Sequence, residues 1–109
     1  IDGKATGVQI TSGDVPLLPE TYDFAAMGLV PVGAYKNRKF REDMVAMDEG
    51  FDPILRDIFF DPQTSGGLLI GCLEKEAENL LGRLHDAGID ESAIIGRAGS
   101  EKQSTIQLL

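Results

Sequence analysis

The polar residues best placed for chemistry lie in one short stretch, Asp61–Gly67. It carries one amide and two hydroxyl side chains, those of Gln63, Thr64 and Ser65, followed by the paired glycines Gly66 and Gly67. Glycine permits positive φ and lets a ligand or another segment approach the backbone closely. Loops held by a rigid scaffold often carry function. The residues alone are also compatible with a tight turn whose side chains satisfy their own backbone.

The segments on either side predict how this loop is held. Asp52 is a good N-cap and Pro53 suits the first helical position, so a helix is expected from there, with an apolar face formed by Ile54, Leu55, Ile58 and Phe59. Pro62 ends that helix, because the residue before a proline avoids the helical region. The apolar run Leu68–Leu73 is the best strand candidate in the chain. The polar loop is therefore expected between a helix and a strand anchored in one core.

The remaining pattern predicts an α+β fold with a mixed sheet. The segments 7–11, 93–96 and 104–108 indicate strands, and 97–103 a turn. Residues 20–27 favour a short helix with Tyr22, Ala25, Ala26 and Leu29 on a core face. Residues 74–87 favour a longer helix, with an apolar stripe of Ala77, Leu80, Leu81, Leu84 and Ala87 and a C-terminal cap at Gly88. The stretch 30–33 is expected to be a loop, and 40–47 fits either an extended segment or a short helix.

Other residues that could do chemistry have plainer interpretations. Cys72 lies inside the apolar run and is expected to be a small buried hydrophobe without a catalytic role. His85 lacks partners at metal-ligand spacing and is expected on a helix surface. Four positive charges fall within Lys36–Arg41, which could hold an anion, but acidic Glu42 and Asp43 follow, so a solvated loop is favoured. No metal site is expected here.

Composition restricts the class of protein. The 109 residues suffice for one domain, and 42% hydrophobic with 26% charged residues is typical of a globular protein. A net charge of −8 disfavours electrostatic binding to nucleic acid, and one cysteine excludes an intrachain disulfide. No transmembrane run or signal peptide is recognised, which favours a cytoplasmic protein with no membrane partner. Because the chain begins at Ile1 rather than Met, we expect a piece of a longer protein.

Nearly the whole chain, from about residue 7 onward, resembles the selenide, water dikinase (selenophosphate synthetase) family. The stretch D-P-Q-T-S-G-G-L-L-I-G at 61–71 is similar to the hallmark of its carboxy-terminal domain. Pro16–Pro19, Ala25–Pro31, Gly33 and Asn37 follow the family's order and spacing. The family's domain resembles that of aminoimidazole ribonucleotide synthetase, which implies α/β/α layers.

The resemblance implies an ATP- and Mg²⁺-dependent enzyme that makes selenophosphate, AMP and phosphate from selenide. It also implies a homodimer of two-domain subunits. In the family the reactive cysteine or selenocysteine, the metal ligands and the phosphate-binding parts lie upstream of this segment. The piece alone is therefore expected to be inactive, contributing one wall of the active-site cleft. Its contacts to phosphate or to the amino-terminal domain would come from Gln63, Thr64, Ser65, Gly66, Gly67 and Asn37.

One departure from the family's pattern occurs before Asn37. Where the family has P-G-G-T, this chain has Pro31-Val32-Gly33-Ala34, which removes the freedom of one glycine and one hydroxyl donor. This counts against a phosphate contact by that loop. Two other classes remain open on the residues: another ATP-using enzyme of the superfamily, such as a thiamine-phosphate kinase or a hydrogenase-maturation protein, and a non-catalytic binding or dimerisation module. An ordering role for the 63–67 loop also stays open.

Overall fold

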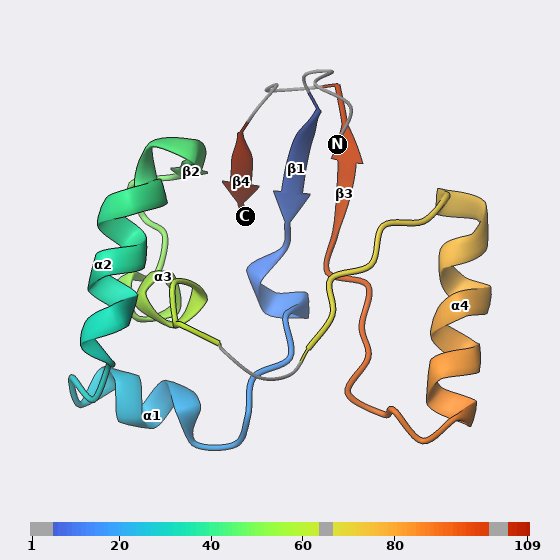
Figure 1. Cartoon of the computed structure of the whole chain (residues 1–109), viewed down its shortest axis with the longest axis horizontal. Coiled ribbons are helices and arrows are strands. Elements are labelled where there is room, and N and C mark those ends of the chain that lie inside the picture. The colour runs from blue at the N-terminus through green and yellow to red at the C-terminus, as the bar shows by residue number, and fades with distance from the viewer. Residues whose placement is uncertain (1–5, 64–66, 101–104) are drawn as a thin grey trace.

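A mixed four-stranded sheet forms the centre of the protein, seen in a computed structural model that describes residues 6–63, 67–100 and 105–109 (Figure 1). The strands stand in the order β2-β4-β1-β3. β1 pairs antiparallel with β3 and parallel with β4, which in turn pairs parallel with β2. Their bounds are β1 Gly7–Ile10, β2 Val45–Met47, β3 Gly96–Gly99 and β4 Ile106–Leu108.

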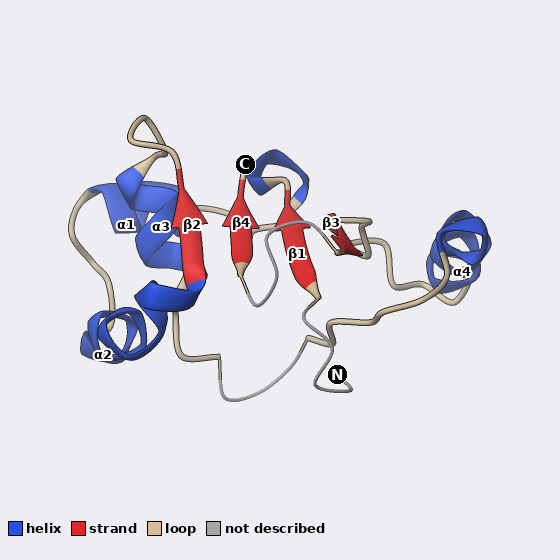
Figure 2. Cartoon of the chain, turned by 90° about the horizontal axis from the view of Figure 1, so that it is seen from above, coloured by secondary structure: helices blue, strands red, loops and turns tan. Residues whose placement is uncertain are grey.

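The helices lie toward the two ends of the sheet. The α-helices are α1 Thr21–Ala26, α2 Val32–Arg41, α3 Pro53–Phe59 and α4 Glu74–Asp86, with short 3-10 turns η1 Ser12–Asp14 and η2 Glu42–Met44. Figure 2 shows α1, α2 and α3 gathered beside β2, and α4 beyond β3. An ion pair of 2.8 Å between Arg97 of β3 and Glu74 of α4 joins two exposed side chains. None of the helices in the described part of the chain has the length and apolarity that crossing a membrane requires.

The predicted start of α3 and the predicted helix α4, which rest on capping residues and an apolar stripe, are confirmed. The carboxylate of Asp52 accepts a hydrogen bond of 2.8 Å from the backbone N–H of Ile54, and Pro53 begins α3. In α4, Ala77, Leu80, Leu81 and Leu84 are its half-buried residues, although Ala87 is exposed. Gly88 follows with φ of +87°. The observed sheet with helices also confirms the α+β class, whereas the α/β/α layering remains an expectation from the resemblance.

The prediction of a strand at Leu68–Leu73 is wrong. These residues belong to no strand, and Leu68 and Leu69 are 89% and 80% exposed. A strand needs a neighbour to receive its backbone hydrogen bonds, and the described sheet contains none that pairs with this run. Cys72 is accordingly exposed and not buried as expected.

Several other elements begin or end at residues that differ from those predicted. The loop expected at 30–33 holds for residues 30 and 31, whereas Val32 and Gly33 begin α2. The solvated loop expected at 36–41 is wrong, because these residues belong to the same helix. Of the two interpretations of 40–47, neither holds throughout: α2 ends at Arg41, and after a 3-10 turn the extended alternative is realised in β2. The strand expected at 93–96 begins only at Gly96 and continues into the expected turn. The core face expected around Tyr22 is largely exposed, with Leu29 64% accessible.

Few side chains are deeply buried. Among the described apolar residues the most enclosed are Ala34 in α2, 2% exposed, and Leu108 in β4, 5% exposed. Leu108 in the sheet and Ala34 in α2 therefore mark two separate points of close packing. Only the second lies near the polar loop.

Candidate functional site

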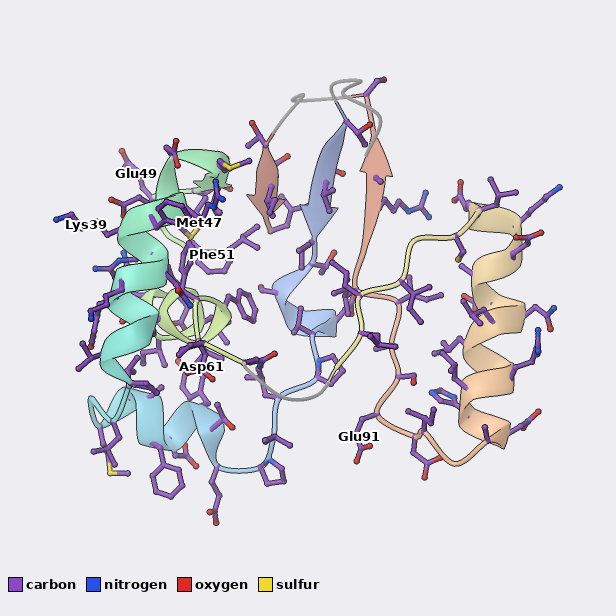
Figure 3. The ribbon with its side chains drawn as sticks, viewed as in Figure 1. Lys39, Met47, Glu49, Phe51, Asp61 and Glu91 are labelled. Carbon is purple, nitrogen blue, oxygen red and sulfur yellow. The ribbon has the colours of Figure 1, made fainter. Side chains whose placement is uncertain are left out.

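The polar loop begins at the C-terminal end of α3, where Figure 3 labels Asp61. The backbone N–H of Asp61 donates to the carbonyl of Ile58 at 3.0 Å, which continues the helical turn past Phe60. Two residues later the N–H of Gln63 donates back to the carbonyl of Asp61, also at 3.0 Å. The chain thus leaves α3 through two consecutive backbone-bonded turns. These two hydrogen bonds therefore fix the position of the Gln63 backbone relative to α3.

Helix α2 contacts this exit at two places. The side-chain Nδ2 of Asn37 donates to the carbonyl oxygen of Phe60 at 3.0 Å. One turn earlier, Gly33 lies so close to Pro62 that a Cβ on Gly33 would stand 2.8 Å from the proline Cγ. Asn37 is thus brought to the loop predicted from the sequence, although it is 23 residues away from Phe60 in the chain.

The other predicted site residues divide into two groups. Gln63 and Gly67 are exposed, and Gly67 has a φ of +72°, the left-handed conformation that its lack of a side chain permits. Thr64, Ser65 and Gly66 lie outside the described residues. Roles for all six predicted residues remain predictions.

Sequence reasoning missed the contacts that hold α2 against α3. Arg38 and Asp57 form an ion pair of 2.8 Å between side chains that are 28% and 21% exposed. Ala34, which replaces a hydroxyl residue of the family pattern, is buried in the same helix. A signal was available: Gly33, Ala34, Asn37 and Arg38 are spaced as neighbours on one face of a helix. It was overlooked because Pro31 and Gly33 favoured a loop.

Neither of two shallow hollows on the described surface is lined by Asn37 or Gln63. One lies over the β1–β3 edge, lined by residues that include Gln9 and Arg97. The other lies beside α4 near Cys72 and Arg83. Within the described ranges, no three His, Cys, Asp or Glu side chains come together in a way that could hold a metal ion. Of the predicted site residues that the structure describes, Asn37, Gln63 and Gly67 are exposed.

His85 has a structural partner. Its Nε2 lies 2.9 Å from the carbonyl oxygen of Ser92, in the turn that follows α4. The side chain is exposed on the helix. The predicted surface position of His85 is confirmed.

A second polar contact ties α1 to the start of α3. The hydroxyl of Tyr22 donates to Asp52 Oδ2 at 2.6 Å, while Asp52 Oδ1 accepts from Ile54. The Tyr22 hydrogen bond, followed by the backbone one, lowers the pKa of Asp52. The same bond raises the pKa of Tyr22, because the phenol donates its proton to a carboxylate. Both α1 and the helix that leads to the polar loop therefore depend on Asp52.

Replacing Asp52 by alanine is expected to lower the unfolding temperature of the full-length protein at pH 7. The folded pKa of Asp52 is depressed, so its stabilisation is present above the unfolded value of about 4. This stabilisation is lost as pH falls through the lower folded value. Asp52→Asn is the matched control, because asparagine caps helices about as well but has no charge to titrate. Thermal unfolding between pH 3 and 7 should show a flatter acid limb for both variants; an Asp52→Ala protein that unfolds like wild type would contradict this role.

Comparison with known proteins identifies a set of relatives, although no family model matches the chain. A selenide, water dikinase of Pelobacter propionicus is 46% identical over 95 residues, which are 87% of this chain and 27% of that protein. Selenide, water dikinase 2 of Peptoclostridium acidaminophilum is 36% identical over 95% of the chain and 30% of its own length. The selenide, water dikinase of Caldanaerobacter subterraneus is 38% identical over 88% and 27%. The chain thus spans less than a third of the length of these relatives.

Proposed function

We propose that this chain, which is similar to part of several selenide, water dikinases, forms part of the C-terminal domain of an enzyme that phosphorylates selenide. The reaction would consume ATP and water and give selenophosphate, AMP and phosphate. The observation that carries the proposal is the sequence identity of 36% to 46% to these relatives over 87% to 95% of the chain. The same resemblance favours a cytoplasmic enzyme.

Within such an enzyme, the exposed loop after α3 would face the reacting groups. Gln63, Thr64, Ser65, Gly66 and Gly67 would donate side-chain and backbone hydrogen bonds to a phosphate or to the amino-terminal domain. Asn37 would lie beside them. Support comes from the exposure of Gln63 and Gly67 and from the backbone-bonded turns that fix where the loop begins. Donors placed in advance at a site of developing negative charge are effective because they need no reorganisation during the reaction.

The nucleotide and its metal would be held mainly by the rest of the enzyme. Among the described residues, no three His, Cys, Asp or Glu side chains are grouped so that they could hold a metal ion. Mg²⁺ commonly binds through one or two carboxylates together with phosphate oxygens. This segment would therefore contribute hydrogen-bond donors, and it would not carry out ATP turnover alone.

The exposed apolar surface supports a partner within the same enzyme. Leu68, Leu69, Ile70 and Leu73 are 52% to 89% exposed in one short run. Exposed apolar groups that lie together mark interaction surfaces in native proteins. We assign this surface to the remaining part of the longer chain, above all its amino-terminal domain, and we expect the complete enzyme to form a homodimer.

The test is an assay of the full-length native protein with ATP and Mg²⁺, with and without selenide. We expect AMP and phosphate to form only when selenide is present, and selenophosphate to appear in equal amount to AMP. Release of ADP instead of AMP, or nucleotide consumption that ignores selenide, would overturn the proposal. The same protein with sulfide in place of selenide serves as the specificity control.

A further inference from the structure

Three residues of α2 contact α3 and the chain that leaves it. Arg38 pairs with Asp57 inside α3, and Asn37 bonds the carbonyl of Phe60 just after it. Gly33, one turn nearer the start of α2, meets Pro62. As the residue number falls along α2, the partner's number rises, so the contacts run in antiparallel order. The buried methyl group of Ala34 lies on the same face.

These contacts leave α2 little freedom to slide along α3. Asn37 bonds Phe60 and Arg38 pairs with Asp57. If α2 slid along α3, both contacts would be lost together, so they specify the same register of the two helices. The Gly33–Pro62 approach adds a steric limit, since a side chain at position 33 would overlap the proline ring. Polar contacts and a close backbone approach therefore specify the same placement.

We propose that Gly33 and Asn37 are positioning residues, which set where Asp61–Gln63 lies and so where the polar loop begins. The proposal rests on the proposed function for its consequence in the reaction. Asn37 acts through the carbonyl of Phe60, because its amide donates a hydrogen bond to that oxygen. Gly33 acts through Pro62, which immediately precedes Gln63.

Gly33→Ala separates this role from ordinary helix propensity. Alanine normally stabilises a helix relative to glycine, and Gly82→Ala in α4 should do so, because no atom lies within 4 Å of the added Cβ. At Gly33 the methyl group would meet Pro62, so we expect faster amide exchange at Gln63. We also expect kcat to fall by about tenfold to a hundredfold with little change in KM. Pro62→Ala removes the ring atoms that clash, and it should restore part of the lost rate when combined with Gly33→Ala.

Asn37→Asp provides a second variant if Gly33→Ala does not fold. Aspartate has the same shape, but its carboxylate cannot donate to the carbonyl of Phe60. Faster exchange at Asp61 and Gln63 in the unliganded full-length protein, with unchanged exchange in α4, is the expected result. A direct ligand contact by Asn37 would instead leave exchange unchanged without substrate.

Amide exchange tests the positioning role, and selenide-dependent AMP formation tests the proposed function, so failure of one can be told from failure of the other. Unchanged exchange at Gln63 in both variants, together with additive effects of Gly33→Ala and Pro62→Ala, would overturn the positioning role regardless of activity. Faster exchange with an unchanged kcat would support the positioning and overturn the part of the loop in the reaction. If wild type shows no selenide-dependent AMP formation, the proposed function fails, and the exchange data still decide the positioning.

Discussion

Full-length protein that carries both Thr64→Ala and Ser65→Ala is expected to form AMP from ATP and selenide at least roughly a hundredfold more slowly than wild type. If the loop donates hydrogen bonds to a phosphate, two hydroxyl donors to a charged group are removed together. Hydrogen bonds to charged groups contribute about 1.5–3 kcal/mol each. A loss of this size should appear in kcat, while the unfolding temperature changes little. Steady-state AMP formation and thermal unfolding are measured on the same preparations.

Conservative exchanges provide the control for this prediction. Thr64→Ser and Ser65→Thr keep a hydroxyl at each position, so both should retain most of the activity. If the residues only order a turn by bonding their own backbone, the double alanine variant will lose stability and keep its kcat. That result would remove the loop from the reaction while leaving the family relationship intact.

The parts of the fold that could be predicted depend on signals between near neighbours in the chain. Asp52 and Pro53 predict the start of α3, because the capping hydrogen bond joins residues only two positions apart in the chain. The charge and apolar pattern of residues 74–87 likewise specifies α4. In both helices the local preference and the observed structure agree.

The errors concern contacts between distant segments. Leu68–Leu73 has the composition of a strand, but composition does not supply a pairing partner. Pro31 and Gly33 suggested a loop, whereas Pro31 precedes the first turn of α2 and Gly33 provides room for Pro62. The same limit applies to the candidate site. Its polar residues were found from their types and the resemblance, but the bond from Asn37 to Phe60 depends on how two helices pack.

Gly96→Ala is expected to cause the largest loss of stability of the substitutions considered, about 3 kcal/mol or more. Gly96 pairs with Ile10 where β3 runs antiparallel to β1. A Cβ at this position would overlap the backbone carbonyl oxygen of Gln9 and lie about 3 Å from two further backbone atoms of β1. Backbone atoms within a paired strand cannot rotate away as a side chain can. The strands must therefore separate, which breaks the β1–β3 pairing at its start.

Gly99→Ala at the other end of the same strand is the matched control. Gly99 pairs with Gly7, and no atom lies within 4 Å of its added Cβ. That substitution also reduces the freedom of the unfolded chain, so its effect should be neutral or slightly stabilising. The backbone N–H of Thr11 donates to the carbonyl of Ile95, the residue before Gly96, at 2.9 Å. Native-state amide exchange at Thr11 in the full-length protein therefore reports the local opening free energy of this pairing without requiring two-state unfolding of the whole enzyme. Equal protection of Thr11 in the two variants would mean that β3 is not held against β1 in this register, because the close approach to β1 occurs at Gly96 and not at Gly99.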